Sequence, residues 1–221
     1  ETAENLVDRY DISRVEQDEF ALESQQKARA GTDARADELF PVEVPAGKGT
    51  VIVTSDEHPR PETTLDALAK LKPLFREGGT VTAGNSSGLT DGAAAMVLMS
   101  ESRAKAEGRD PLARIIGMSW AGVPPEIMGI GPVPATKKVL DRTGLSLADI
   151  DLIEINEAFA AQVIACEREL KFERDRLNVH GGGISLGHPI GMSGARIILS
   201  LAYAMRSRGA ALGLATLCIS G

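Results

Sequence analysis

Cysteines, aromatic residues and long apolar runs are all scarce in this 221-residue sequence. Cys166 and Cys218 are too few and too far apart for a disulfide framework, which favours a reducing compartment: the cytoplasm, or an organelle matrix if the source is eukaryotic. Aromatic residues make up 4% of the chain, so packing has to rely on aliphatic side chains and close glycine contacts. The longest apolar stretch, residues 195–205, is interrupted by Arg196 and is too short to span a bilayer, so no membrane partner is expected.

Positive charge is scarce as well, because 24 Lys and Arg stand against 31 Asp and Glu and give a net charge of −7. No basic stripe is present, which argues against nucleic-acid binding, although a few local cations can still hold an anionic small ligand. No metal site and no tightly bound cofactor are predicted. The first residues, Glu1–Glu4, contain neither a signal peptide nor an initiator methionine, and we expect them to come from the middle of a longer protein.

The order of the predicted elements indicates an α/β fold. Ser13 and Glu16 form a capping-box pattern that predicts a helix to about Ala30, ended by Gly31. Prolines surround a short predicted strand at residues 50–53. Further strands are expected at residues 93–99, 112–118, 151–155 and 212–217, and further helices at residues 100–108, 135–143, 158–170 and 193–207. This alternation predicts a largely parallel sheet covered by helices on both faces, with a domain boundary near residue 90.

Three short polar motifs follow apolar segments in the second half of the chain. Asn156 begins Asn-Glu-Ala-Phe-Ala, His188 lies in Gly-His-Pro-Ile-Gly, and Cys218 follows the apolar run at residues 212–217. Parallel α/β folds place functional groups beyond the carboxyl ends of their strands. Pro189 is expected to start a helix, and a neutral imidazole at a helix N-terminus is a competent general base. The alternatives are structural: an N-cap for the asparagine, a capping or buried histidine, and a cysteine packed in the core.

A competing pattern is Gly-Asn-Ser-Ser-Gly at residues 84–88, which matches the G-x-S-x-G nucleophile elbow and would make Ser86 the nucleophile of a serine hydrolase. His188 lies downstream of it, in the order that such an enzyme needs. An elbow requires a strand before it and a helix after it, whereas the element predicted next is the strand at residues 93–99. This spacing disfavours the hydrolase. Cys166, inside a predicted helix, is expected to be an inert core residue.

Together these motifs resemble those of the thiolase family of acetyl-CoA acyltransferases, and the similarity extends over the whole chain. Residues 80–88 and 91–95 resemble the family's pantetheine-loop segment. Pro59-Arg60 with Thr63-Thr64, and Ile127-Met128-Gly129 with Gly131-Pro132, also match the family. The resemblance implies a thiolase-like layered α/β fold, in which a mixed, mostly parallel sheet lies between helices and carries part of an inserted loop domain.

The resemblance also implies roles in a two-site mechanism that makes or cleaves a carbon–carbon bond between acyl-CoA units. His188 matches the histidine that activates a nucleophilic cysteine and contributes to an oxyanion hole, in which Asn156 positions a water. Cys218 matches the acid/base at the α-carbon, and the backbone N–H of Ser220, where many members have Gly, matches the second oxyanion hole. Coenzyme A or an acyl-CoA is then the substrate. The residues that match coenzyme A contacts are Arg60, Ser87, Phe75, Leu89, Met128 and Phe159.

The family's nucleophilic cysteine lies in an N-terminal half that the resemblance does not find in this chain, and neither cysteine present matches it by position. On the family template, residues 1–89 are part of the loop domain, residues 90–111 are the last strand and helix of the N-terminal domain, and residues 112–221 are the C-terminal domain. We therefore expect the chain alone to be inactive, and the whole protein to be a homodimer or homotetramer. Two alternatives share the fold: a ketosynthase, which typically has a second histidine where Asn156 stands, and a non-catalytic acyl-CoA- or lipid-binding relative.

Overall fold

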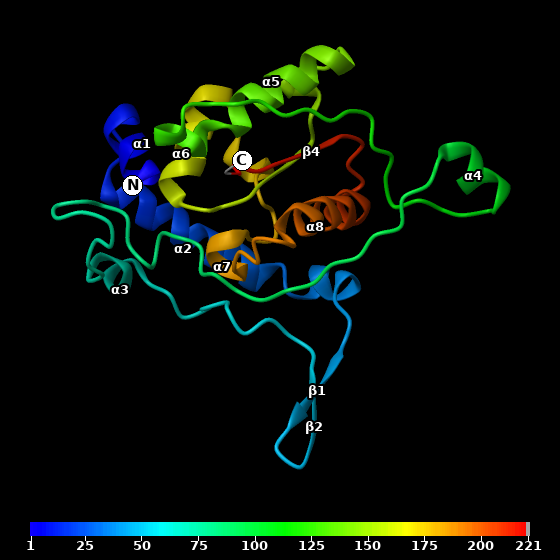
Figure 1. Cartoon of the computed structure of the whole chain (residues 1–221), viewed down its shortest axis with the longest axis horizontal. Helices are drawn as coiled ribbons and strands as arrows, with labels where there is room; N and C mark the ends of the chain where they lie inside the picture. The colour runs from blue at the N-terminus through cyan, green and yellow to red at the C-terminus, as the bar shows by residue number, and fades with distance from the viewer. Residues whose placement is uncertain (220–221) are drawn as a thin grey trace.

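The computed structural model describes residues 1–219, so the expectation for Ser220 lies outside the described residues (Figure 1). The α-helices are α1 (Thr2–Tyr10), α2 (Arg14–Ala30), α3 (Leu65–Ala69), α4 (Glu101–Ala106), α5 (Pro132–Thr143), α6 (Ala160–Leu170), α7 (Gly183–Leu186) and α8 (Ser193–Arg208). The 3₁₀ turns are η1 (Asp33–Glu38), η2 (Pro125–Ile130), η3 (Leu147–Asp149) and η4 (Arg174–Arg176). The strands are β1 (Val42–Ala46), β2 (Gly49–Val53), β3 (Leu152–Ile155) and β4 (Gly213–Thr216).

Helix α2 begins where the capping box predicts. The Glu16 backbone N–H donates to the Ser13 hydroxyl at 3.1 Å, and the Ser13 backbone N–H donates to the Glu16 carboxylate at 2.8 Å. Gly31 follows the helix, and a Cβ at this position would lie only 2.8 Å from the Cβ of His180, so the close approach requires glycine. The helix packs along α7, the turn that leads to His188.

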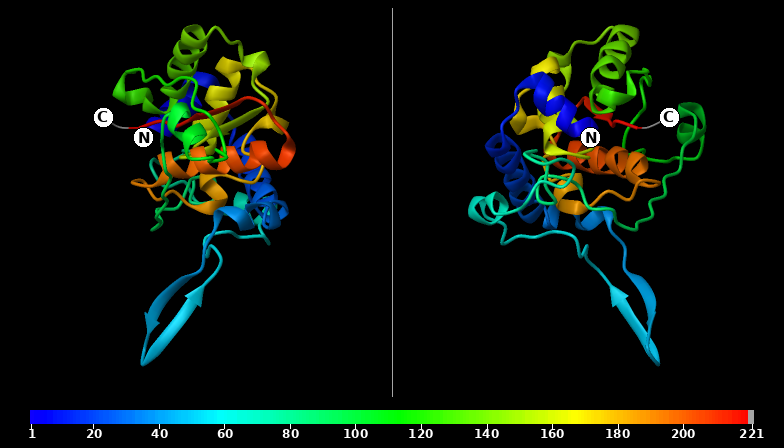
Figure 2. Two further views of the ribbon diagram at one scale, coloured as in Figure 1. Left: turned by 90° about the vertical axis from the view of Figure 1, so that its right-hand side faces the viewer. Right: turned by 60° about the vertical axis from the view of Figure 1, so that its left-hand side comes forward.

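Strands β3 and β4 form the buried centre of the molecule. They pair in parallel, from Leu152 opposite Gly213 to Ile155 opposite Thr216. Leu152 packs with side chains of α8 on one face, whereas Ile153 and Ile155 belong to a cluster that includes side chains of α1 and α6 on the other (Figures 1 and 2). Ile155 is completely buried, and such burial stabilises the fold by about 1.5–3 kcal/mol. The prediction of parallel strands covered by helices on both faces is confirmed for this pair.

A second pair of strands projects away from the body of the molecule. β1 and β2 form an antiparallel hairpin in which Val44 lies opposite Val51, and Figure 2 shows it extending beyond the helices as a narrow ribbon. Gly47 in its turn has φ of 59°, a conformation that favours glycine. The strand expected at residues 50–53 is confirmed, but its side chains are exposed, with Ile52 at 64%.

Two other expected strands are absent from the structure. Residues 93–99 and 112–118 are irregular and carry exposed apolar side chains, including Val97 at 84% and Met118 at 70%. A strand needs a neighbour for its backbone N–H and C=O groups and a cover for each apolar face. Residues 1–219 supply neither at these positions, so the apolar pattern alone does not produce a strand. The helix expected after the first of these segments is confirmed as α4. Among the described residues, no helix is long and apolar enough to cross a membrane.

Candidate functional site

The carboxyl end of β3 brings Asn156 and His188 together. Asn156 directly follows the strand, is 1% exposed, and its Nδ2 lies 3.2 Å from the Nε2 of His188. Its backbone N–H donates to the Thr216 carbonyl at the end of β4, at 3.1 Å, which fixes its position in the sheet. Asn156 is not an N-cap, because α6 begins at residue 160 and has Phe159 at its N-cap position. The capping alternative for Asn156 is therefore wrong.

The imidazole of His188 is held from its other side by Ser193. The Nδ1 of His188 lies 2.6 Å from the Ser193 hydroxyl, and that hydroxyl donates its proton to the Pro189 carbonyl at 3.0 Å. Because the Asn156 Nδ2 group faces Nε2, Nε2 is assigned as the acceptor, and the neutral ring then carries its proton on Nδ1, beside the Ser193 hydroxyl oxygen. Burial lowers the pKa of His188, and the positive charge of Arg196 lowers it further. The ring is consequently neutral near neutral pH, with its basic nitrogen toward the amide.

The helix after His188 begins at Ser193, as the predicted range 193–207 has it, and not at Pro189. Pro189 was predicted to be the first helical residue, but its carbonyl accepts from the N–H groups of Met192 and Ser193, both at 2.8 Å, and α8 begins only at Ser193. A turn therefore separates the histidine from the helix. Burial and Arg196 lower the pKa of the imidazole, and the expected effect of the helix dipole stays a prediction.

Residues 85–89 lie in space between the motif that begins at Asn156 and the motif that contains His188. The backbone N–H of Ser87 donates to the Ala158 carbonyl at 3.0 Å, and its hydroxyl donates to the same carbonyl at 3.2 Å. The backbone N–H of His188 donates to the Gly88 carbonyl at 2.8 Å, and Leu89 forms a parallel bridge with His188. The segment that resembles the pantetheine loop therefore borders the amide–imidazole pair.

The serine of the elbow-like pattern is not poised for catalysis. Ser86 is 9% exposed, and its hydroxyl donates to the Thr82 carbonyl at 2.7 Å rather than to an imidazole. The residues on either side of it form neither the strand nor the helix that an elbow needs. The serine hydrolase hypothesis is therefore contradicted.

Of the other residues expected to contact coenzyme A, three lie near the amide–imidazole pair or the segment at residues 85–89, and two lie on other segments. Phe75 and Phe159 meet edge to face with ring centroids 6.0 Å apart, next to the bridge between residues 86 and 159. Leu89 is 81% exposed and adjoins His188. Met128 lies in η2, which packs on α1 and α6. Arg60 is exposed, with its backbone N–H donating to the Gln25 side chain at 2.8 Å.

The two cysteines occupy different positions in the fold. Cys218 follows β4, two residues beyond the carbonyl that accepts from Asn156, and is 7% exposed. Burial raises its pKa to about 11, so the thiol is protonated at neutral pH. Cys166 is completely buried in α6, with its Sγ 3.5 Å from the Gly129 carbonyl and burial raising its pKa to about 12. Cys166 is therefore an inert core cysteine, as expected. The convergence of Cys218 on His188 stays a prediction.

A buried polar network behind the pair was not anticipated from the sequence. Glu157 is 1% exposed and accepts hydrogen bonds from Ser24 at 2.6 Å, Asn178 at 2.8 Å and the Ile184 backbone N–H at 3.1 Å. Burial raises its pKa, and these hydrogen bonds oppose that effect. The contact of Ser193 with His188 was not predicted from the sequence either. Glu157 follows Asn156 in the same motif, but nothing in its spacing distinguishes it from a solvent-facing carboxylate.

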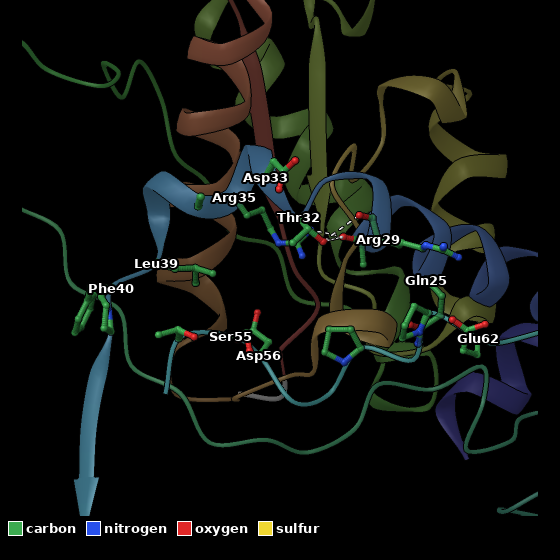
Figure 3. Close-up of a pocket in the computed structure, with 16 residues that line it drawn as sticks. Gln25, Arg29, Thr32, Asp33, Arg35, Leu39, Phe40, Ser55, Asp56 and Glu62 are labelled. Atoms are coloured by element: carbon green, nitrogen blue, oxygen red, sulfur yellow. Dashed lines mark hydrogen bonds between the residues drawn. The ribbon is translucent and has the colours of Figure 1, made fainter. Parts of the chain in front are cut away.

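A cavity of about 670 Å³ lies elsewhere. It is open to solvent between the end of α2, η1 and the base of the hairpin, with Arg29, Arg35, Phe40, Asp56 and Glu62 among its lining residues (Figure 3). None of the predicted site residues lines it. A smaller cavity of about 340 Å³ adjoins Pro189. The chemistry at Asn156 and His188, rather than cavity size, defines the site.

An amide and a neutral imidazole at the carboxyl end of a parallel strand pair, with helices on both faces, are features of an α/β enzyme. Residues 1–102 match the family model for the N-terminal domain of thiolase, and residues 109–221 match that for the C-terminal domain. The chain belongs to the thiolase family.

Relatives of the chain are similar over its whole length. It is 55% identical to an acetyl-CoA acetyltransferase of Escherichia coli and 56% identical to one of Pseudomonas aeruginosa, covering 100% of this chain and 56% and 57% of those proteins. The crystal structure of the Bacillus anthracis acetyl-CoA acetyltransferase matches with a TM-score of 0.97 at 52% identity, over 99% of this chain and 56% of that one. Human mitochondrial 3-ketoacyl-CoA thiolase in complex with CoA matches with a TM-score of 0.93 at 50% identity, over 99% and 55%. The chain thus spans little more than half the length of these relatives.

Proposed function

We propose that the protein containing this chain is an acetyl-CoA C-acyltransferase, which interconverts acyl-CoA plus acetyl-CoA with 3-ketoacyl-CoA plus coenzyme A. The observation that carries the proposal is the contact between Asn156 and the basic nitrogen of His188, bordered by residues 85–89. The fold, and the names of relatives that are more than half identical, support the same reaction class.

His188 is proposed to activate the nucleophilic cysteine. Its Nε2 carries the lone pair, so it can accept the thiol proton and then donate from the same nitrogen to an oxyanion. Asn156, whose Nδ2 lies 3.2 Å from that nitrogen, is proposed to position a water in the same oxyanion hole. Pre-oriented donors of this kind stabilise negative charge as it develops on the thioester oxygen. The nucleophile is proposed to lie in the family's N-terminal half, because neither cysteine of this chain matches it.

Cys218 is proposed to act at the α-carbon of the second thioester. In cleavage, the enzyme thiolate attacks the 3-keto carbon, the bond between carbons 2 and 3 breaks, and its electron pair forms the enolate of acetyl-CoA. A thiol with a pKa of about 11 is protonated and can give that enolate its proton. Coenzyme A then takes the acyl group from the enzyme cysteine. In synthesis the proton moves back to a Cys218 thiolate. The backbone N–H of Ser220 is the proposed donor to the second oxyanion.

Coenzyme A is proposed to run past the segment at residues 85–89. Ser87 and Leu89 lie on that segment, and the Phe75–Phe159 pair adjoins it. Arg60 is free to reach an anionic group, since its side chain is exposed. Met128 is included only through its match to the family. The human mitochondrial 3-ketoacyl-CoA thiolase that matches this chain is a complex with CoA, which supports this substrate class.

The remaining parts of the proposal concern the whole protein. The domain limits are proposed as residues 1–89, 90–111 and 112–221, and the assembly as a homodimer or homotetramer in the cytoplasm. The exposed hairpin and the exposed apolar side chains at residues 93–99 support association with further protein surface. The ketosynthase alternative is disfavoured by Asn156, and the non-catalytic alternative by the intact amide–imidazole geometry.

The test is the activity of the whole protein on acetoacetyl-CoA and coenzyme A, followed by loss of the enolate absorbance. The whole protein is expected to turn over this substrate, and the His188→Ala variant is expected not to. The 221-residue chain assayed in parallel is expected to be inactive, because covalent acyl transfer cannot begin without the nucleophile. A whole protein that binds acyl-CoA but neither cleaves nor forms the carbon–carbon bond would refute the proposal in favour of the non-catalytic alternative.

A further inference from the structure

We propose that Glu157 is a positioning residue that sets the placement of His188 relative to Asn156. It does so by holding the turn at residues 182–185 against the carboxyl end of β3. The kinetic part of its test rests on the proposed function, whereas the structural part does not.

Three segments of the chain meet at the Glu157 carboxyl group. Its Oε1 accepts from the Asn178 amide at 2.8 Å, and its Oε2 accepts from the Ile184 backbone N–H at 3.1 Å and from the Ser24 hydroxyl at 2.6 Å. Ser24 belongs to α2 and Ile184 to α7, which ends two residues before His188. One buried side chain adjacent to Asn156 therefore ties the histidine-bearing turn to the strand end.

The backbone of this turn lies directly on Asn156 and Glu157. A Cβ at Gly182 would come within 2.3 Å of the Glu157 carboxyl carbon, and one at Gly183 within 2.9 Å of the Glu157 carbonyl. The Ile184 carbonyl lies 3.2 Å from the Nε2 of His58. The Ile184 backbone is thus contacted through both its N–H and its C=O, and a displacement of this turn would carry His188 with it.

Glutamine cannot replace the carboxyl group at this position. Asn178 has a fixed orientation, because its Oδ1 accepts from the Ile155 N–H at 2.9 Å and its Nδ2 donates to the Ile155 carbonyl at 2.9 Å. In Glu157→Gln, if the new NH₂ group faces Ile184, two donors meet there, because the Ile184 backbone N–H also donates. If it faces Asn178, it meets the donating Asn178 NH₂ group instead. Either orientation leaves a buried donor without an acceptor.

Glu154 provides a matched control on the same strand. It is 6% exposed, and its carboxyl group has no hydrogen-bond partner among residues 1–219. Burial and the nearby Glu157 raise its pKa to about 8, so it is largely protonated near neutral pH. Glutamine is close in shape to a protonated glutamate, so Glu154→Gln should leave the site undisturbed.

The experiment compares Glu157→Gln with Glu154→Gln in the whole protein. Active sites are counted by the end point of acetylation with labelled acetyl-CoA, and kcat is expressed per active site. Glu157→Gln is expected to lower kcat by roughly ten- to hundredfold, as for a misplaced catalytic group, with KM for coenzyme A within about twofold. Glu154→Gln is expected to stay within about twofold in both parameters. A purely structural role would reduce the number of active sites and leave kcat per site unchanged, which would overturn the proposal.

A crystal structure of Glu157→Gln supplies the readout that does not depend on turnover. The separation of Asn156 Nδ2 and His188 Nε2 is expected to exceed about 3.5 Å, beyond hydrogen bonding. An intact pair would contradict the positioning role, even if the wild-type protein proves to have another activity. Should the variant fail to fold, Ser24→Ala removes one of the three donors and is expected to lower kcat by about threefold to tenfold. An unchanged kcat in Ser24→Ala would then overturn the proposal.

Discussion

Residues 152–155 and residues 93–99 are both rich in apolar side chains, Glu154 being the exception in the first, yet only the first segment forms a strand. Ile155 is completely buried between β4 and the helices, whereas Val97 is 84% exposed and has no paired neighbour among the described residues. The difference lies in the surroundings, because β4 supplies hydrogen-bond partners to one segment and nothing among residues 1–219 supplies them to the other. An apolar run therefore specifies a strand only where a partner strand and a covering layer are available.

The same contrast separates the two parts of the site. Asn156 and His188 are held by hydrogen bonds that start from the β3–β4 pair. Leu89 and Arg60 lie on exposed connecting segments. The paired region fixes the groups proposed to do chemistry, and the connecting segments carry the groups proposed to hold the long substrate. The contrast predicts large effects from the first region and small effects from the second.

The largest effect is expected from His188→Ala in the whole protein. Removing the proposed base should lower both acetyl transfer from acetyl-CoA to the enzyme and overall condensation by about 10²–10⁴-fold. Ser102→Ala in the exposed helix α4 is the matched control from the other region and should leave both rates unchanged. Rapid-quench measurement of enzyme acetylation checks this. An unimpaired acetylation rate in His188→Ala would remove the imidazole from the proposed role.

The next largest effect concerns stability. Ile155→Ala should lower the free energy of unfolding of the 221-residue chain by about 2–5 kcal/mol, because it opens a cavity in the core. Val97→Ala in the same chain should change it by less than about 0.5 kcal/mol, since the side chain is exposed. In the whole protein, residues 93–99 are expected to form the last strand of the N-terminal domain, so Val97→Ala should lower the free energy of unfolding by more. Denaturant titrations of the 221-residue chain and of the whole protein measure these changes in the free energy of unfolding. Equal changes for Val97→Ala in the two forms would contradict the comparison.

A smaller effect is expected from the pH dependence of stability. Glu154 has an ordinary pKa of 4.5, and burial raises it to about 8 in the folded chain. The unfolded chain loses this proton above its lower pKa while the folded chain keeps it, so stability falls as pH rises from about 4.5 to 8. Glu154→Gln should flatten this slope and be more stable than wild type at about pH 8. Thermal unfolding at a series of pH values measures it. Parallel profiles would show that Glu154 is not the source.

The smallest effect is a change in a titration. Burial and Arg196 lower the pKa of His188, so the neutral base persists below the ordinary value of 6.5. Arg196→Gln removes the positive charge and should move the acid limb of kcat/KM toward higher pH. Arg206→Gln, on the same helix but exposed and paired with Asp110 at 3.1 Å, should leave the limb in place. Identical pH profiles for the two variants would argue against control of the imidazole by Arg196.

Local signals predicted much of the fold because they depend on few neighbours. Ser13 and Glu16 indicated helix α2, and the positions of α5, α6, α8, β3 and β4 followed from periodicity and glycine. The strands expected at residues 93–99 and 112–118 could not be judged in this way, since their formation depends on residues outside the segment. The expectation that Pro189 starts a helix was wrong because proline begins a turn as readily as a helix.

The site was predictable only where a residue type carries its own chemistry. Asn156 and His188 stood out as an amide and an imidazole after apolar segments, and they meet. Ser193 and Glu157 did not, because a serine or a glutamate has many solvent-facing roles. Their contacts come from the turns at residues 182–192, whose conformation depends on glycines and on packing against α2.

The most direct test of the account is the effect of Cys218→Ala on two reactions of the whole protein, because the account assigns Cys218 to the α-carbon and not to acylation. Acetyl exchange between acetyl-CoA and labelled coenzyme A needs only the nucleophile and His188, whereas condensation to acetoacetyl-CoA also needs a proton removed from the α-carbon. Cys166→Ala, in the inert core position, is the matched control. The account predicts that Cys218→Ala retains exchange and loses condensation by about 10²–10⁴-fold. Equal losses in both reactions would contradict it.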